Sequence, residues 1–177
     1  MSQVTNTNSL SEILDTIDLG PTGSVQMMFA KLQLAQSEIC KNQAEAYMEQ
    51  IESIQEEQEL CAKMIEDARE LQNKAKNGEG DCPWDKKASM MTQEMADFFN
   101  DRGLKYDTTG KDLANNSDEW DYALKSLTSY QETVGNKTQT LMVYLQDFIG
   151  QYNSYLQGAN TQIANANQTL TNLARGQ

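Results

Sequence analysis

Residues 148–174 contain no charged side chain, although their apolar residues recur at helical spacing. The remaining positions are mostly Asn, Gln, Thr, Ser and Gly. A surface helix of a soluble monomer normally places Lys and Glu opposite its apolar stripe. Amides and hydroxyls can be buried against identical neighbours without the several kcal/mol that desolvating a charge costs. The segment therefore predicts a helix that is packed by copies of itself, and the alternative is a disordered polar tail.

This segment belongs to a longer predicted helix, residues 117–177. Ser117 is its expected N-cap, and Asp118 and Glu119 in the first turn favour the helix dipole. Steps of four and three residues then join Trp120, Leu124, Leu127, Gln131, Val134, Thr138, Leu141, Leu145, Phe148, Tyr152 and Tyr155. After one extra step of four, the pattern continues through Ala159, Ile163, Ala166, Leu170 and Leu173. From this seam we select as candidate packing and assembly residues Leu141, Leu145, Phe148, Tyr152, Tyr155, Ile163, Leu170 and Leu173. Gly135, Gly150 and Gly158 each cost this helix roughly 1 kcal/mol relative to Ala, which packing must offset unless the helix bends.

A first long helix is predicted over residues 24–76. Ser24 is a plausible N-cap, and Asn77-Gly78 is a strong helix breaker. Its apolar seam is expected to run through Val25, Met28, Leu32, Ala35 and Ile39, then, after a slip near Gln43 and Tyr47, through Ile51, Ile54, Cys61, Ile65 and Ala68. Of these, Met28, Leu32 and Ile39 are further candidate packing residues.

The two helices are joined by a connector, residues 77–116. We expect a short amphipathic helix after Pro83, bearing Trp84, Ala88, Met91, Met95 and Phe98 or Phe99. Residues 104–109, between Gly103 and Gly110, favour a small hairpin or an irregular loop. Residues 1–23 are rich in Ser, Thr and Asn and contain no Lys or Arg, so we expect them to be flexible. The predicted fold is all-α: a long antiparallel, coiled-coil-like helical hairpin with a small mixed insertion.

The residues needed for catalysis or metal binding are largely missing. The chain of 177 residues has no histidine, which removes the commonest general base and metal ligand. Cys40, Cys61 and Cys82 match no zinc spacing, and no Gly-rich phosphate loop is present. We therefore expect no enzyme, no catalytic residue, no metal and no cofactor.

The three cysteines are odd in number, so they cannot all pair within one chain. On one helix Cys40 and Cys61 would lie about 31 Å apart, too far for a disulfide. We expect them to be small apolar seam residues, and we expect Cys82, in the loop before Pro83, to be the most exposed of the three.

The overall charge narrows the class of partner. The net charge is −12, which argues against nucleic acid and against an anionic lipid surface. No stretch approaches the ~18 consecutive apolar residues of a membrane span, and the N-terminus has no basic region followed by an apolar one, as a conventional secretory signal would. Glu45, Glu49, Glu52, Glu56 and Glu59 share one helix face, which we interpret as a solvated acidic face rather than a site for a cation or a basic partner.

Two further clusters have competing interpretations. Phe148, Tyr152 and Tyr155 could form a ligand slot, but their helical spacing favours packing. Several methionines could form an adaptable binding surface, although a core role is the simpler interpretation. They are Met27, Met28, Met90, Met91, Met95 and Met142.

Three segments give the chain a family resemblance. They are residues 28–37 (MFAKLQLAQS), residues 99–103 (FNDRG), and the Leu124-Lys125-x-Leu127 start of a C-terminal helix rich in Asn, Gln and Thr. In these segments and in its layout over residues 24–177, the chain resembles the EspA/SseB-like filament proteins of bacterial type III secretion systems. It departs from them in its longer uninterrupted seam and in its last residues, 172–177.

This resemblance implies a secreted subunit that polymerises into a hollow filament extending the secretion needle, a conduit for translocators and effectors to host cells. It implies export without a cleaved signal peptide, with residues 1–23 as the export segment, and an extracellular location on the bacterial surface. The implied partners are other copies of the chain, the needle subunit, pore-forming translocators and a cytoplasmic export chaperone. Two alternatives remain: a needle-tip protein that forms a small closed ring, and an intracellular coiled-coil adaptor or chaperone.

Overall fold

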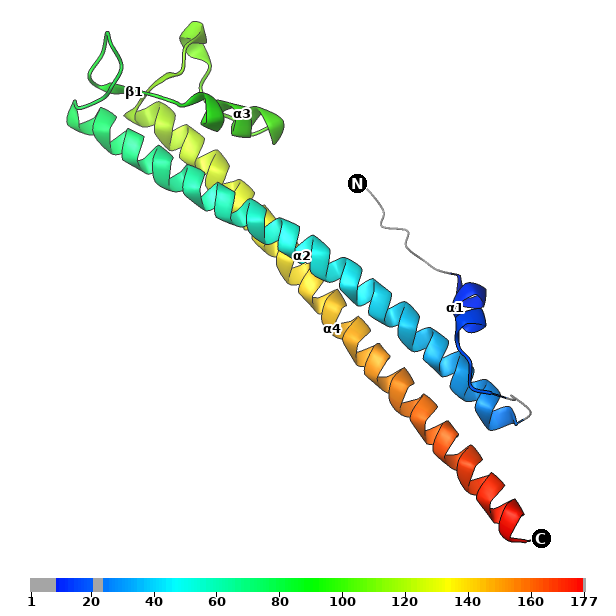
Figure 1. Ribbon diagram of the computed structural model, residues 1–177. Coiled ribbons are helices and arrows are strands. Elements are labelled where there is room, and N and C mark those ends of the chain that lie inside the picture. The colour runs from blue at the N-terminus through cyan, green and yellow to red at the C-terminus, as the bar shows by residue number, and fades with distance from the viewer. Residues whose placement is uncertain (1–8, 21–23, 177) are drawn as a thin grey trace. The chain divides into compact units, whose positions relative to one another are not determined.

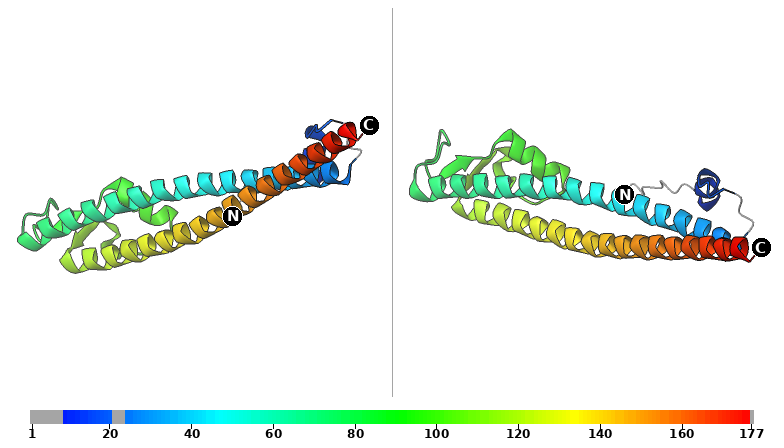
Figure 2. Two further views of the ribbon diagram at one scale, coloured as in Figure 1. Left: turned by 90° about the horizontal axis from the view of Figure 1, so that it is seen from below. Right: turned by 60° about the horizontal axis from the view of Figure 1, so that its bottom comes forward.

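Two long helices dominate the computed structural model, which describes residues 9–20 and 24–176. In chain order the elements are α1 (Leu10–Thr16), α2 (Val25–Asn77), β1 (Ala88–Met90), α3 (Gln93–Asp101), the 3-10 turn η1 (Thr109–Lys111), β2 (Ala114–Asn116) and α4 (Ser117–Arg175). Within each compact part of the chain, the long helices α2 and α4 pack against each other (Figures 1 and 2), as the sequence predicts. A small two-stranded sheet lies in the connector between them.

The chain divides into two compact units, and each long helix contributes to both. The central unit comprises residues 52–139. The terminal unit comprises residues 1–51 and 140–177, of which 9–20, 24–51 and 140–176 are described. Each unit has its own set of buried side chains.

Short polar sequences fix where the long helices begin and end. The Ser24 hydroxyl accepts a hydrogen bond from the Met27 N–H at 3.2 Å, as expected for an N-cap. Helix α2 ends before Gly78, whose φ of 72° and N–H bond to the Ala75 carbonyl terminate the helix in a left-handed turn. The prediction for α4 is wrong by one residue, because Asn116 is the cap rather than Ser117. The Asn116 side chain accepts from two backbone N–H groups, and the Glu119 carboxylate accepts from the Asn116 N–H at 2.7 Å.

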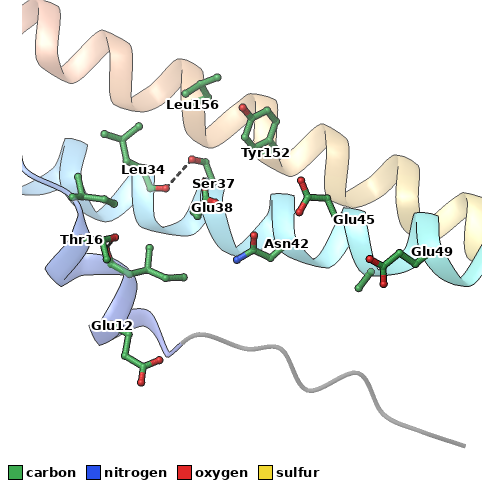
Figure 3. A pocket seen from close by; sticks show the side chains of 13 residues that line it. Glu12, Thr16, Leu34, Ser37, Glu38, Asn42, Glu45, Glu49, Tyr152 and Leu156 are labelled. Atoms are coloured by element: carbon green, nitrogen blue, oxygen red, sulfur yellow. Dashed lines mark hydrogen bonds between the residues drawn. The ribbon is translucent and has the colours of Figure 1, made fainter.

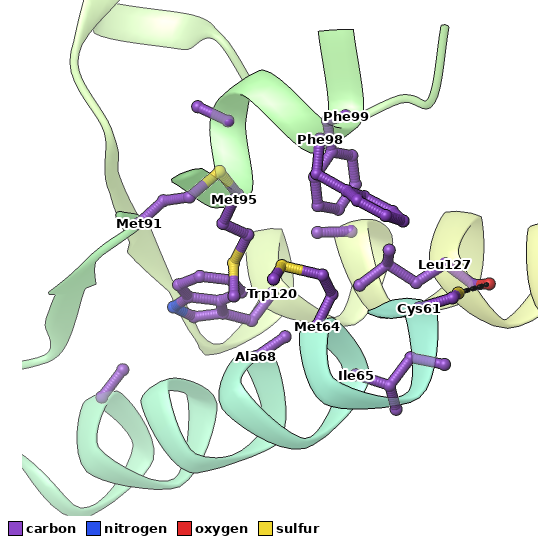
Figure 4. Packing of buried hydrophobic residues seen from close by; sticks show 13 residues of the cluster. Cys61, Met64, Ile65, Ala68, Met91, Met95, Phe98, Phe99, Trp120 and Leu127 are labelled. Carbon is purple, nitrogen blue, oxygen red and sulfur yellow. Dashed lines mark hydrogen bonds between the residues drawn. The ribbon is translucent and has the colours of Figure 1, made fainter. Parts of the chain in front are cut away.

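The principal apolar core lies in the central unit (Figure 4). Its largest fully buried side chains include Trp120, Phe99, Met64, Met95 and Leu127, which come from α2, α3 and α4. The indole N–H of Trp120 donates to the Ser89 hydroxyl at 2.7 Å, and that hydroxyl donates to the Leu71 carbonyl at 2.8 Å. The one polar group of the buried indole is therefore satisfied, and the same bonds join α4, β1 and α2.

The connector differs from the prediction. Helix α3 begins only at Gln93, capped by the Thr92 hydroxyl, so Met95 and Phe99 lie on it while Ala88 lies in a strand. Strands β1 and β2 are antiparallel, with Ala88 opposite Asn116. Residues 104–108 contain no helix or strand. Strands of three residues are too short for periodicity to detect, which explains why the pattern suggested one helix.

The loop from Gly80 to β1 is held in place by its backbone. A Cβ on Gly80 would lie 1.9 Å from the Ala88 carbonyl oxygen, so only glycine fits there. This turn buries Cys82 completely and leaves the Trp84 side chain 67% exposed. Both expectations, an exposed Cys82 and a packed Trp84, are therefore wrong.

The three cysteines are free and buried, and burial raises the pKa of the Cys40 and Cys61 thiols.

A charged cluster joins α3 to both long helices in the central unit. The Arg102 guanidinium donates to both carboxylate oxygens of Glu57, and its Cζ lies 3.9 Å from the centre of the Phe98 ring. The Tyr130 hydroxyl donates to the same carboxylate at 2.7 Å. The Arg102 bonds hold the pKa of Glu57 below its usual value, while burial and the bond to Glu57 raise the pKa of Tyr130 to about 12.

In the terminal unit the two helices are antiparallel, and only part of the predicted seam of α2, including Ala35 and Ile51, is buried. Tyr47 packs on Tyr144 and on Phe148, with ring centres 5.8 and 5.6 Å apart. The Cys40 thiol lies 3.8 Å from the Gln151 side-chain oxygen. The buried residues of α2 in this unit are Ala30, Ala35, Ser37, Cys40, Ala44 and Ile51.

The expected seam residues Val25 and Met28 are instead 65% and 61% exposed. Three small residues spaced by seven, Ala30, Ser37 and Ala44, are buried although the predicted seam did not contain them. Ile51 lies seven residues after Ala44 and continues this spacing without the slip proposed near Gln43 and Tyr47.

Candidate self-association surface

The predicted seam of α4 follows the burial pattern closely as far as Ala166. In the terminal unit Leu141, Ala159 and Ala166 are buried. Partly buried side chains are Leu145, Phe148, Tyr152, Tyr155 and Ile163. The last two predicted residues behave differently, because Leu170 is 63% and Leu173 is 65% exposed.

The exposure of Leu170 and Leu173 follows from the pairing of the two helices. Gln33 of α2 lies against Gly158 of α4, so close that a Cβ on that glycine would lie 2.6 Å from the Gln33 amide nitrogen. Antiparallel helices rise by the same ~1.5 Å per residue, so Val25 at the start of α2 is level with Ala166. Residues 167–176 therefore extend past α2, and every one of them is exposed (red end of α4 in Figure 1). We call this segment the overhang.

A second apolar stripe runs along α4 and joins the predicted seam at Ile163, and the sequence analysis missed its first three residues. Its residues are spaced by exact heptads: Met142, Ile149, Leu156, Ile163 and Leu170. Met142, Ile149 and Leu170 are exposed by 46%, 43% and 63%, and the other two are partly buried. The strict spacing of seven was the available signal, because it is the pattern of a helix that packs against a further helix.

The solvent face of this part of α4 has no charge, and its three threonine hydroxyls are bonded within the helix. The Thr161, Thr169 and Thr171 hydroxyls each donate to the backbone carbonyl four residues earlier, at 2.9 Å. Their donor requirement is met inside the helix, so covering them with another protein surface costs less than covering a free hydroxyl. A Cβ added to Gly150 on the same helix would meet no atom within 4 Å, whereas one added to Gly158 would meet Gln33. The cost of Gly150 in the helix is therefore not offset by any packing within the described chain.

An apolar groove lies between α1 and the first turns of α2, also in the terminal unit. Its volume is ≈ 560 Å³, and it is lined by Leu14, Val25, Met28, Phe29, Lys31 and Leu32. Met28 and Phe29 are 61% and 55% exposed. Of the predicted packing residues of the first helix, Met28 and Leu32 thus line an open groove, and Ile39 is partly buried.

A second, larger groove of the terminal unit is acidic (Figure 3). It has a volume of ≈ 830 Å³, and its wall includes Glu12, Glu38, Glu45 and Glu49 together with Tyr152 and Leu156. Lys41 pairs with Glu38 at 3.4 Å and with Glu45 at 3.9 Å, both exposed. In the described part of the chain, no group of three or more acidic or cysteine side chains is placed to hold a metal ion. The exposed positions of Glu45, Glu49, Glu52, Glu56 and Glu59 agree with a solvated face.

Most of the large exposed apolar side chains lie in the terminal unit. Within the described ranges, large exposed apolar side chains lie in this unit except for Trp84 and Tyr122.

In residues 9–20 and 24–176, which the structure describes, no helix is long and apolar enough to cross a membrane.

Comparison with known proteins finds no relative of this chain. No protein-family model matches the chain, and neither the curated proteins nor the solved structures contain a significant match.

Proposed function

We propose that this protein is a structural subunit that polymerises into an extracellular filament. The observation that carries the proposal is the C-terminal half of α4, where a heptad stripe of large apolar side chains is partly exposed on a helix that has no charge over residues 148–174. A stripe of this kind is stable in water when another helix covers it.

The charge distribution favours a second copy as the covering partner. Copies of a chain with a net charge of −12 repel one another unless they meet through a neutral surface. The uncharged face of α4 is such a surface, since amides supply both donors and acceptors and are therefore self-complementary. The exposed glutamates of α2, including Glu52 and Glu56, would remain in water and keep the assembly soluble.

The resemblance to EspA/SseB-like proteins extends this proposal to a biological setting. The subunit would be exported by a type III secretion system without a cleaved signal peptide and would extend the needle as a hollow conduit for translocators and effectors. Its further partners would be the needle subunit, pore-forming translocators and a cytoplasmic export chaperone. These statements rest on the segments 28–37 and 99–103 and on the helical layout.

Electron microscopy of the purified protein over a range of concentrations tests the proposal. We expect filaments whose length grows with concentration. Rings of fixed size would favour a needle-tip protein instead, because a closed ring saturates and a filament does not. Retention of the protein in the cytoplasm of a secretion-competent strain would favour the intracellular adaptor.

A further inference from the structure

We propose that the overhang of one copy docks into the apolar α1/α2 groove of the next copy, so that subunits join head to tail. This inference rests on the proposed function and names the two surfaces that form one of its contacts.

The overhang is suited to enter a groove on another protein. Leu170 and Leu173 are three residues apart and therefore project from the same side of the helix. Their surfaces are 63% and 65% exposed, and both follow Ala166, the last buried residue of α4. The Thr169 and Thr171 hydroxyls beside them already donate to the helix backbone. The segment can therefore lose water without leaving a charge or a free hydroxyl donor unpaired until Arg175.

The groove is suited to receive apolar side chains. Val25, Met28 and Phe29 are exposed by 65%, 61% and 55%, and five of the six lining residues are apolar. Methionine and phenylalanine can adjust to side chains of irregular shape. Residues 1–8, the segment of the chain next to α1, contain Val4 as their one large aliphatic residue besides Met1, so their composition is poorly suited to fill it.

Charge distinguishes this groove from its neighbour. The larger groove is lined by Glu12, Glu38, Glu45 and Glu49, which would favour a basic partner. The apolar groove is lined by no acid and by one base, Lys31. Residues 167–174 of the overhang carry no charge and are compatible with the apolar groove, and Arg175 would lie outside it, away from Lys31.

The contact must join different copies. Leu170, Leu173, Met28 and Phe29 belong to the same compact unit, and all four are more than half exposed, so they do not cover one another within one chain. Because the overhang and the groove are different surfaces, the contact is heterologous. A heterologous contact leaves a free overhang at one end and a free groove at the other, which allows open-ended growth.

A mixing experiment with two full-length variants tests the pairing. The donor variant loses the apolar side chains of its overhang through Leu170→Ser and Leu173→Ser, and its groove stays intact. The acceptor variant loses apolar side chains of its groove through Met28→Ser and Phe29→Ser, and its overhang stays intact. All four positions are exposed, so both variants should keep the helical content and the buried Trp120 fluorescence of the wild type. Met48→Ser, which removes a side chain that is 48% exposed outside both surfaces, is the matched control.

Sedimentation velocity on each protein and on an equimolar mixture gives the result. We expect each variant alone to lose head-to-tail growth into filaments, the control to assemble as the wild type does, and the mixture to form a head-to-tail heterodimer that grows no further through this contact. In that heterodimer the intact overhang of the acceptor variant would occupy the intact groove of the donor variant.

The other outcomes overturn specific statements. Variants that assemble like the wild type, or a mixture that stays monomeric, overturn the head-to-tail pairing while leaving filament formation intact. A wild-type protein that never assembles overturns the proposed function and the pairing together.

Discussion

Two substitutions on the same helix separate packing inside the subunit from packing between subunits. Leu141 and Leu170 both belong to the apolar pattern of α4, but the first is 8% exposed and the second 63%. Replacing Leu141 with Asp removes about 1.5–3 kcal/mol of apolar burial. It also forces a carboxylate to lose water beside α2, at a further cost of about 1–3 kcal/mol or more. We expect Leu141→Asp to lower the free energy of unfolding by about 2.5–6 kcal/mol, a large part of the 5–15 kcal/mol typical of a domain.

Leu170→Asp has a much smaller expected cost, because only about a third of the side chain is covered by its own chain. The lost burial is about 0.5–1 kcal/mol. Urea denaturation followed by circular dichroism, at protein concentrations too low for assembly, measures both values. At high concentration Leu170→Asp should reduce filament formation, whereas Leu141→Asp should unfold the terminal unit. Equal destabilisation by the two substitutions would refute the reasoning, because it would mean that the overhang is covered within its own chain.

Three further outcomes are expected. Gly150→Ala should stabilise the isolated subunit by about 0.5–1 kcal/mol, because nothing in the described chain opposes a Cβ there, and a chemical denaturation curve measures the gain. If that same substitution slows filament growth, Gly150 is a point of close approach between copies. Glu57→Gln should cost about 1–3 kcal/mol near pH 7, where the carboxylate binds Arg102 and Tyr130. Since the pKa of Glu57 is lowered in the folded protein, this contribution is complete above the ordinary pKa of a glutamate and is lost as the pH falls through the folded value. The difference between wild type and variant should therefore shrink on acidification, with Trp120 fluorescence as the signal in a Trp84→Phe background, and a difference independent of pH would contradict it. Finally, all three cysteines should react slowly with a thiol reagent in the folded protein and rapidly in urea, and fast native labelling of Cys82 would contradict its burial.

The long helices could be predicted from sequence because their signals are repeated many times. The steps of four and three from Trp120 to Ala166 recur over many turns, so a few ambiguous residues such as Gln131 and Thr138 do not obscure them. Ser24 and Gly78 marked the start and end of α2 because capping and left-handed turns depend on few residue types.

The predictions failed where packing depends on small residues or on distant backbone. The buried residues of α2 in the terminal unit include Ala30, Ser37 and Ala44, which the predicted seam did not contain. Cys82 and Trp84 were placed wrongly because a bond from the Cys82 N–H to the Ala88 carbonyl, at 3.3 Å, folds their loop against β1. No local pattern in the sequence encodes that contact.

The candidate surface was predicted in part. The absence of charge in residues 148–174 was visible in the sequence, but the exposure of Leu170 and Leu173 depends on the pairing of Gln33 with Gly158, which sets where α2 begins relative to α4. The apolar groove depends on α1, a helix of seven residues within a segment that we expected to be flexible. Its capping box, formed by Ser9 and Glu12, was present in the sequence and would have been a signal for that helix.

The central claim is that copies of this chain associate through the uncharged part of α4 into an open-ended polymer. The most direct test is sedimentation velocity of the wild-type protein over a wide concentration range, with electron microscopy of the same samples. The account predicts species whose mass increases continuously with concentration and filaments in the micrographs. A monodisperse, folded monomer at every concentration would contradict it.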